Sequence, residues 1–223
     1  MAEKYGTVPK KFTKEWWEYF WMYYKWHTIS IFVAIVVIGF SVYSSITAVK
    51  YDLTLTYAGE ELSYDETAKK LEDTLSPLCK DIDENGESSI FLSRINVDFD
   101  SLDYEYLSAM ITKLDLAFSA DETYLFILNK NIADRYKGEN ADKAAFAPLA
   151  DWLTADISDM NTYSAHGEEY GVDLSNLKIF KDLGIDMTDH YLFMRYRPRK
   201  NQENKQLKGY NAAIDLANKI LEN

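Results

Sequence analysis

The sequence has few of the residues that build catalytic, metal or disulfide sites. Its 223 residues include one cysteine, three histidines and nine glycines. A single cysteine, Cys79, excludes an internal disulfide. The histidines show no HExxH spacing, and neither a GxSxG motif nor a glycine-rich phosphate loop is present. We therefore expect a protein that is not an enzyme and that carries no cofactor.

Positive charge is also scarce. The chain has 24 lysines and arginines against 36 aspartates and glutamates, a formal net charge of −12. Phosphate-backbone binding depends on clustered basic residues, so this balance argues against a nucleic-acid partner.

Residues 28–49 contain no charged side chain at all. A helix of 22 residues is about 33 Å long, enough to cross a hydrocarbon core of about 30 Å. Strands rarely exceed about ten residues, so the length favours a helix despite the many β-branched side chains. We expect a transmembrane helix over 28–49. The alternative is a buried hairpin in a soluble domain.

An aromatic-rich stretch, WWEYFWMYYKW, directly precedes this run. Eight of its eleven residues are aromatic, and helical spacing leaves only a narrow polar stripe of Lys14, Glu18 and Lys25. Tryptophan and tyrosine favour the headgroup level of a membrane, so an anchoring belt is expected, with a specific partner surface as the alternative. The residues assigned to the membrane interface are Trp16, Trp17, Trp21, Tyr24 and Trp26.

The two sides of the apolar run differ in charge. Residues 1–27 hold five lysines, whereas residues 50–223 hold 19 basic and 33 acidic residues. The positive-inside rule then predicts a single-pass signal anchor in the cell membrane, with residues 1–27 cytoplasmic and the 50–223 domain extracellular. The lipid bilayer is the first expected partner. No cysteine stands near the end of the run, so no lipid-attachment site is visible.

Residues 50–223 show alternating strand and helix patterns. The β-α-β-α-β order of the first half predicts an α/β domain with a mostly parallel sheet. A capping box at Ser63 and Glu66 marks one helix start. Residues 154–189 are polar and are expected to be irregular. The expected strands are 51–59, 88–100, 123–130 and 190–197, and the expected helices are 63–79, 101–118, 141–153 and 201–223.

A family resemblance rests on this order and on a few local motifs. The segments YDLTLTYAG, DETAKKLEDTL, RINVDF, LSAMITKLDLAFSA, TYLFILNK and AFAPLADWL, with the closing strand and helix, resemble the first lobe of extracellular solute-binding proteins of ABC importers. The stretch after the third strand matches that family at Phe146, Pro148, Leu149, Asp151 and Trp152. The resemblance covers roughly residues 51–153 and 190–221, and implies a fold like one lobe of a periplasmic-binding protein.

Two departures from that family affect the expected function. Only residues 154–189 separate the matching parts, which leaves no room for the second lobe, and the usual lipid-modified cysteine is missing. A single lobe cannot enclose a ligand from both sides. If the family's geometry persists, a ligand would lie at the carboxyl ends of the strands. The residues implied there are Tyr57, Gly59, Asn129 and Lys130.

The segment DIDENGESSI resembles a calcium loop. Asp81, Asp83 and Asn85 fit the first three ligand positions, and Gly86 fits the sharp turn. The position of the bidentate glutamate is Leu92, however, which predicts poor affinity. The alternative is an acidic turn in which Asn85 and Gly86 adopt positive φ.

One basic cluster stands out in the acidic domain, within RYRPRK. It suggests contact with an anionic partner, whereas the alternative is a solvated strand end that balances nearby acids. The residues are Arg195, Arg197, Arg199 and Lys200.

These observations favour a single-pass membrane protein that presents a non-catalytic binding or interaction domain. It would be an accessory or scaffold part of a membrane complex, with another membrane protein as its partner. The alternative is a reduced solute receptor associated with an ABC importer, and a third hypothesis is an enzyme whose site the sequence does not reveal.

Overall fold

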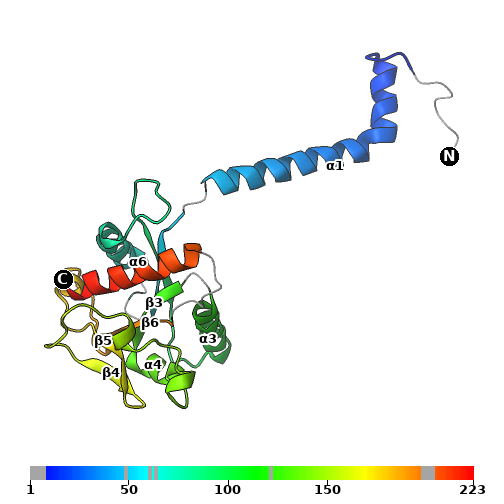
Figure 1. Cartoon of the computed structure of the whole chain (residues 1–223). Coiled ribbons are helices and arrows are strands. Elements are labelled where there is room, and N and C mark those ends of the chain that lie inside the picture. The colour runs from blue at the N-terminus through cyan, green and yellow to red at the C-terminus, as the bar shows by residue number, and fades with distance from the viewer. Residues whose placement is uncertain (1–8, 48–49, 60–61, 63–64, 121–122, 197–203) are drawn as a thin grey trace. The chain divides into compact units, whose positions relative to one another are not determined.

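The computed structural model describes residues 9–47, 50–59, 62, 65–120, 123–196 and 204–223 (Figure 1). The chain divides into two compact units, residues 1–49 and residues 50–223.

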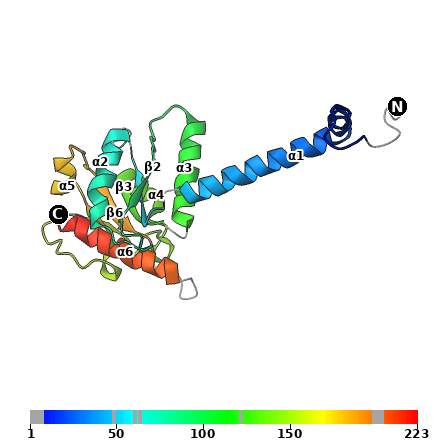
Figure 2. The ribbon, with the colours of Figure 1, turned by 90° about the horizontal axis from the view of Figure 1, so that it is seen from above.

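The first unit contains one long helix, α1 (Lys14–Thr47), of 34 residues. Its Lys14–Ser45 segment is long and apolar enough to cross a membrane, and none of its most apolar stretch is buried. Figures 1 and 2 both show a sharp bend in α1 near its blue N-terminal end. The helix therefore has a short arm and a longer arm in different directions.

The described residues of the second unit form one six-stranded sheet in the order β2-β1-β3-β6-β5-β4. Pairs β1–β2 and β1–β3 are parallel, whereas β3–β6, β5–β6 and β4–β5 are antiparallel. The prediction of a mostly parallel sheet was wrong, because the half of the sheet built after β3 runs antiparallel. The strands are β1 (Leu53–Ala58), β2 (Ile90–Ile95), β3 (Thr123–Asn129), β4 (Thr162–Ala165), β5 (Glu168–Asp173) and β6 (His190–Met194).

The hairpin β4–β5 lies within the stretch expected to be irregular. Its two-residue loop, His166–Gly167, has φ of 55° and 85°. Positive φ at both loop residues matches the twist of antiparallel strands and favours a tight hairpin. The strands are short and polar, so alternation alone did not predict them.

Helices cover both faces of the sheet (Figures 1 and 2). They are α2 (Asp65–Leu75), α3 (Tyr104–Ser119), α4 (Lys130–Tyr136), α5 (Lys178–Asp182) and α6 (Asn204–Leu221), with 3-10 turns at Ser76–Leu78, Ala141–Lys143 and Leu149–Asp151. The prediction of a helix over 141–153 was wrong, because this segment contains two separate 3-10 turns. Pro148, which lacks a backbone N–H, is the N-cap residue of the second turn. The capping residue expected at Ser63 lies outside the described residues.

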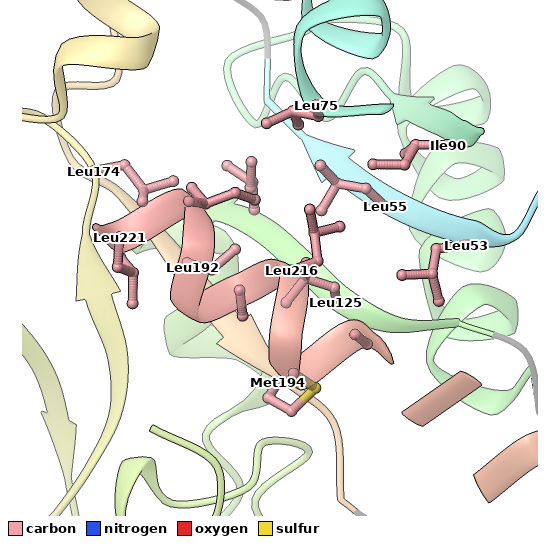
Figure 3. Packing of buried hydrophobic residues seen from close by; sticks show 14 of the residues in the cluster. Leu53, Leu55, Leu75, Ile90, Leu125, Leu174, Leu192, Met194, Leu216 and Leu221 are labelled. Carbon is pink, nitrogen blue, oxygen red and sulfur yellow. The ribbon is translucent and has the colours of Figure 1, made fainter. Parts of the chain in front are cut away.

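Two apolar clusters hold the layers together. One joins α2, α5 and α6 to the first face of the sheet, and the other joins α3 and α4 to the opposite face. Figure 3 shows Leu216 and Leu221 of α6 packed over Leu55, Leu125 and Leu192 of the sheet. Six of the seven residues of β3 are buried, because this strand lies in the middle and is covered on both faces.

Helix α3 buries its apolar side chains only in part. On α3 only Leu114 is fully buried, while Leu107, Met110 and Ile111 are half-buried. The second face of the sheet is therefore less completely covered than the first.

Candidate functional site

Strand β2 forms one edge of the sheet and pairs, within the described residues, with β1 alone. Three of its outward backbone groups are bound by side chains. The Leu92 N–H donates to Glu72 Oε1 at 2.8 Å, and the Ile90 N–H donates to Ser76 Oγ at 3.2 Å. On the other side, Lys113 Nζ donates to the Arg94 carbonyl at 3.0 Å. Side chains from α2, the following turn and α3 thus occupy the positions that another strand's backbone would take.

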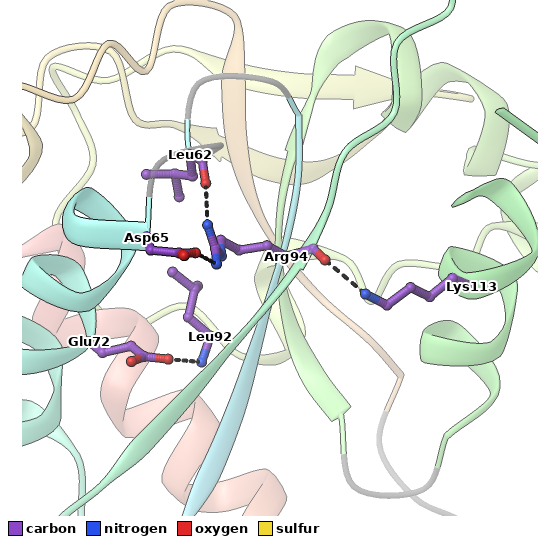
Figure 4. Close-up of polar contacts among 6 residues, drawn as sticks. All are labelled: Leu62, Asp65, Glu72, Leu92, Arg94 and Lys113. Carbon is purple, nitrogen blue, oxygen red and sulfur yellow. Dashed lines mark hydrogen bonds and ion pairs between the residues drawn. The ribbon is translucent and has the colours of Figure 1, made fainter. Parts of the chain in front are cut away.

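A groove of about 670 Å³ follows this edge between α2 and α3. Figure 4 shows β2 running between the two helices, with Glu72 reaching it from one side and Lys113 from the other. The α2 side of the groove carries Ala68 and three charged residues, Asp65, Lys69 and Glu72, and the α3 side carries Tyr106, Met110 and Lys113. The α2 wall is therefore mostly charged, whereas the α3 wall combines two large apolar side chains with one lysine.

Arg94 ties β2 to the start of α2. Its guanidinium donates to the carbonyl of Leu62 at 3.1 Å and forms an ion pair with Asp65. The Asp65 side chain is 93% exposed. Because water screens exposed ion pairs, this contact contributes little stability and mainly sets the direction of the Arg94 side chain.

Exposed apolar side chains gather around the same edge. Among the described residues of the α/β domain, eight large hydrophobic residues are exposed. Six of them belong to β2, α3 or the segment between these elements, whereas Tyr51 precedes β1 and Tyr196 follows β6. Tyr51 and Phe91 contact each other, with ring centroids 5.1 Å apart. We call these residues, together with the groove, the open-edge surface. Its exposed apolar members are Tyr51, Phe91, Phe99, Leu102, Tyr104, Tyr106 and Leu116.

Two of the four implied ligand residues lie at this groove. Tyr57 and Gly59 line it, but both are buried, and the Tyr57 hydroxyl lies 3.2 Å from His190 Nε2. His190 Nδ1 is 2.8 Å from the Thr188 carbonyl, which can only accept, so Nδ1 carries a hydrogen. A Cβ on Gly59 would lie 2.6 Å from the Tyr57 hydroxyl oxygen. The side chains of Tyr57 and His190 therefore fill the space beside Gly59. The proximity of His190 to these residues was not predicted from the sequence.

The other two implied ligand residues form a helix start. The Asn129 side chain accepts the Ile132 N–H at 2.9 Å and caps α4, which begins at Lys130. The Lys130 N–H donates to the Asp189 carbonyl at 2.9 Å. Neither residue lines the groove, so the predicted set is only partly brought together.

The acidic turn brings Asp81 and Asp83 together with Asp52, which sequence reasoning did not include. One oxygen from each carboxylate lies within 4.8 Å of the others, so these three residues could offer ligands to a cation. Each carboxylate also accepts backbone N–H groups. Asp52 accepts from Ile82 at 2.7 Å and Ser89 at 2.9 Å, and Asp81 accepts from Gly86 at 2.8 Å.

Asn85, the third predicted metal ligand, has a different role. Its side-chain oxygen accepts the Glu87 N–H at 2.8 Å. Positive φ occurs at Glu84 and Gly86, not at Asn85 as expected for the alternative turn. Hydrogen bonding within the turn accounts for its acidic composition, and a six- to eight-oxygen calcium shell would need further ligands.

The predicted basic cluster is described only at Arg195. Its guanidinium donates to the carbonyl of Ala120, the C-cap residue that follows α3. Its backbone N–H donates to the Tyr124 carbonyl at 2.8 Å. Arg195 thus joins β6 to the end of α3, and Arg197, Arg199 and Lys200 lie outside the described residues.

The interface residues of α1 present most of their rings outward. The exposed fractions are 54% for Trp17, 57% for Trp21, 46% for Tyr24 and 70% for Trp26. Trp16 is half-buried by contacts within the same unit, including Phe12 and Phe20 at centroid distances of 5.5 Å. An aromatic surface of this type suits a membrane interface.

Cys79 is buried at the end of the turn after α2. Burial raises the pKa of its thiol to about 12. The reactive thiolate is therefore very scarce at neutral pH, as expected for a structural cysteine.

Comparisons with protein-family models, with curated proteins and with solved structures find no match to this chain. The resemblance to solute-binding proteins therefore stays a prediction that rests on the sequence motifs alone. The candidate site rests on the geometry of the β2 edge.

Proposed function

We propose that this chain is a single-pass membrane protein whose α/β domain binds a partner protein through the open-edge surface, without catalysis. The observation that carries the proposal is the groove along β2, which pairs in the described part of the sheet with β1 alone, together with the exposed aromatic side chains beside it. Large exposed apolar patches on soluble domains mark interaction sites, and aromatic side chains and methionine are enriched in protein interfaces.

The anchor supports a partner that is itself in the membrane. The longer arm of α1 suits a membrane span, and the aromatic arm suits the interface. Five residues lie between Thr47 and Leu53, the first residue of β1. An extended chain covers at most about 3.6 Å per residue, so the domain is held on a short tether. A neighbouring membrane protein is then the simplest source of a binding segment.

The proposed orientation can be tested with added cysteines. In the domain the cysteine is placed at Glu87 of the acidic turn, because Glu87 is exposed whereas the neighbouring Ser88 is half-buried. Glu87→Cys is expected to react with a membrane-impermeant thiol reagent on intact cells, and the matched Lys11→Cys only after lysis. The buried Cys79 gives a low background. Labelling in the reverse pattern would overturn the proposed topology.

The proposed surface can be tested by site-specific photo-crosslinking in intact membranes. A photoreactive residue at Tyr51, Phe91 or Tyr106 is expected to form the same discrete adduct, because Tyr51 contacts Phe91 and Phe91 lines the groove together with Tyr106. The matched control positions are the exposed Asn211 and Glu222 on and after α6. Equal adducts at all five positions, or none at the first three, would contradict the proposal. A small solute that raises the melting temperature would instead favour a solute receptor.

A further inference from the structure

We infer that the open-edge surface takes an extended segment of its partner as an added strand beside β2. This inference rests on the proposed function and specifies how the partner is held. An edge strand presents unpaired N–H and C=O groups, and strand addition uses them to bind an extended peptide.

The hydrogen bonds at the edge show what the segment would replace. Glu72 accepts the Leu92 N–H as a strand carbonyl would, and Lys113 donates to the Arg94 carbonyl as a strand N–H would. Both side chains stand on helices beside the strand and can turn away without breaking a backbone ladder. In the unbound chain they form hydrogen bonds with the Leu92 N–H and the Arg94 carbonyl, and so they block non-specific strand pairing. In the complex both side chains turn away from β2, and the backbone of the segment takes their place.

The two walls of the groove define the chemistry of the segment. Side chains of an added strand alternate between the faces of the sheet. On one face they would meet Phe91, Tyr106 and Met110, and on the other Lys69 and Asp65. The groove therefore fits an extended segment that alternates apolar residues with charged or polar residues.

The opposite edge of the sheet offers less to such a segment. Strand β4 has four residues, against six in β2, and belongs to a tight hairpin. Short edge strands are one of the ways in which sheets avoid pairing. Strand addition is thus directed to β2.

The test uses the full chain in detergent micelles and fluorescent ten-residue peptides. A display library of peptides that alternate Val, Ile or Tyr with Lys, Glu or Thr supplies the probe. Each selected peptide is then made in two forms, N-methylated at every odd or at every even residue. Main-chain pairing predicts that one form loses binding at least tenfold, while the other form binds like the parent.

A variant pair tests the role of Glu72. Glu72→Ala leaves the Leu92 N–H open, so peptide affinity is expected to rise roughly tenfold, because no charge-assisted bond must be broken first. Glu66→Ala removes a carboxylate of the same helix that pairs only with the exposed Lys70 in the described contacts, and is expected to change affinity less than about twofold.

The outcomes separate the two proposals. Sensitivity to one N-methylated form, together with the gain in Glu72→Ala, supports strand addition at β2. Equal tolerance of both forms, no peptide binding up to millimolar concentration, or a loss of affinity in Glu72→Ala would overturn it. The photo-crosslinking pattern at Tyr51, Phe91 and Tyr106 would be unaffected by that result, so the proposed partner surface stands or fails by its own test.

Discussion

Helices α3 and α6 cover opposite faces of the same sheet, yet they differ in how they meet it. α6 buries apolar residues along its length, including Tyr210, Leu216 and Ile220, whereas α3 fully buries only Leu114. α3 instead leaves Tyr104 and Leu116 exposed at 77% and 65%. The difference indicates that α6 mainly stabilises the fold, while α3 keeps apolar surface available for another molecule.

The same substitution on each helix gives the largest expected contrast. Leu216→Ala would leave a cavity in the core and is expected to lower the free energy of unfolding by about 3 kcal/mol. Leu116→Ala removes an exposed side chain and is expected to change it by less than about 0.5 kcal/mol. Thermal denaturation of the two variants, side by side, measures this. Similar losses in both would show that α3 is packed as tightly as α6.

A buried polar contact of α6 gives the next largest effect. The Asn218 side chain accepts the Thr154 and Ala155 N–H groups, both at 2.7 Å, and donates to the Trp152 carbonyl at 3.2 Å. Asn218→Ala would leave these buried groups unsatisfied and is expected to cost about 2 to 3 kcal/mol. Denaturant unfolding measures the loss, with the exposed Asn211→Ala as the control. A loss within about 0.5 kcal/mol would mean that this contact contributes little.

Asp52 gives a smaller effect outside both helices. Asp52→Ala removes the carboxylate that accepts the Ile82 and Ser89 N–H groups and is expected to cost about 2 kcal/mol. Asp83→Ala is the control, because its exposed carboxylate accepts a single N–H, from Asn85 at 3.1 Å, in the described contacts.

Calcium is expected to have the smallest effect. The carboxylates of Asp52, Asp81 and Asp83 already accept backbone N–H groups. Millimolar calcium is therefore expected to change the melting temperature of the unaltered chain by less than about 1 °C. A larger, saturable rise that Asp81→Asn abolishes would show that the turn binds the ion.

The elements that were predictable from the sequence have strong apolar patterns. Residues 28–47 of the uncharged run lie in α1, and strands β1, β3 and β6 lie within the predicted ranges, because continuous or alternating apolar residues define them. The direction of the second half of the sheet was not predictable. It depends on β4 and β5, which are short and polar and are joined by a His-Gly turn rather than by a common hairpin dipeptide.

The candidate site was largely hidden from the sequence. Glu72 and Lys113 are 41 positions apart, and only the order of strands reveals that both reach the same edge. One signal was present: α3 carries Tyr104, Tyr106 and Leu116 outside its buried stripe. A helix with more apolar residues than one face can bury often has a second contact.

The junction between β3 and α4 has no connecting residue, since the strand ends at Asn129 and the helix begins at Lys130. Each helical residue turns by about 100°, so one inserted residue would rotate Ile132 and Ala133 away from the sheet. Loop-length variation is therefore expected to be tolerated elsewhere in the domain but not at this joint, where the strand sets the angular position of the helix.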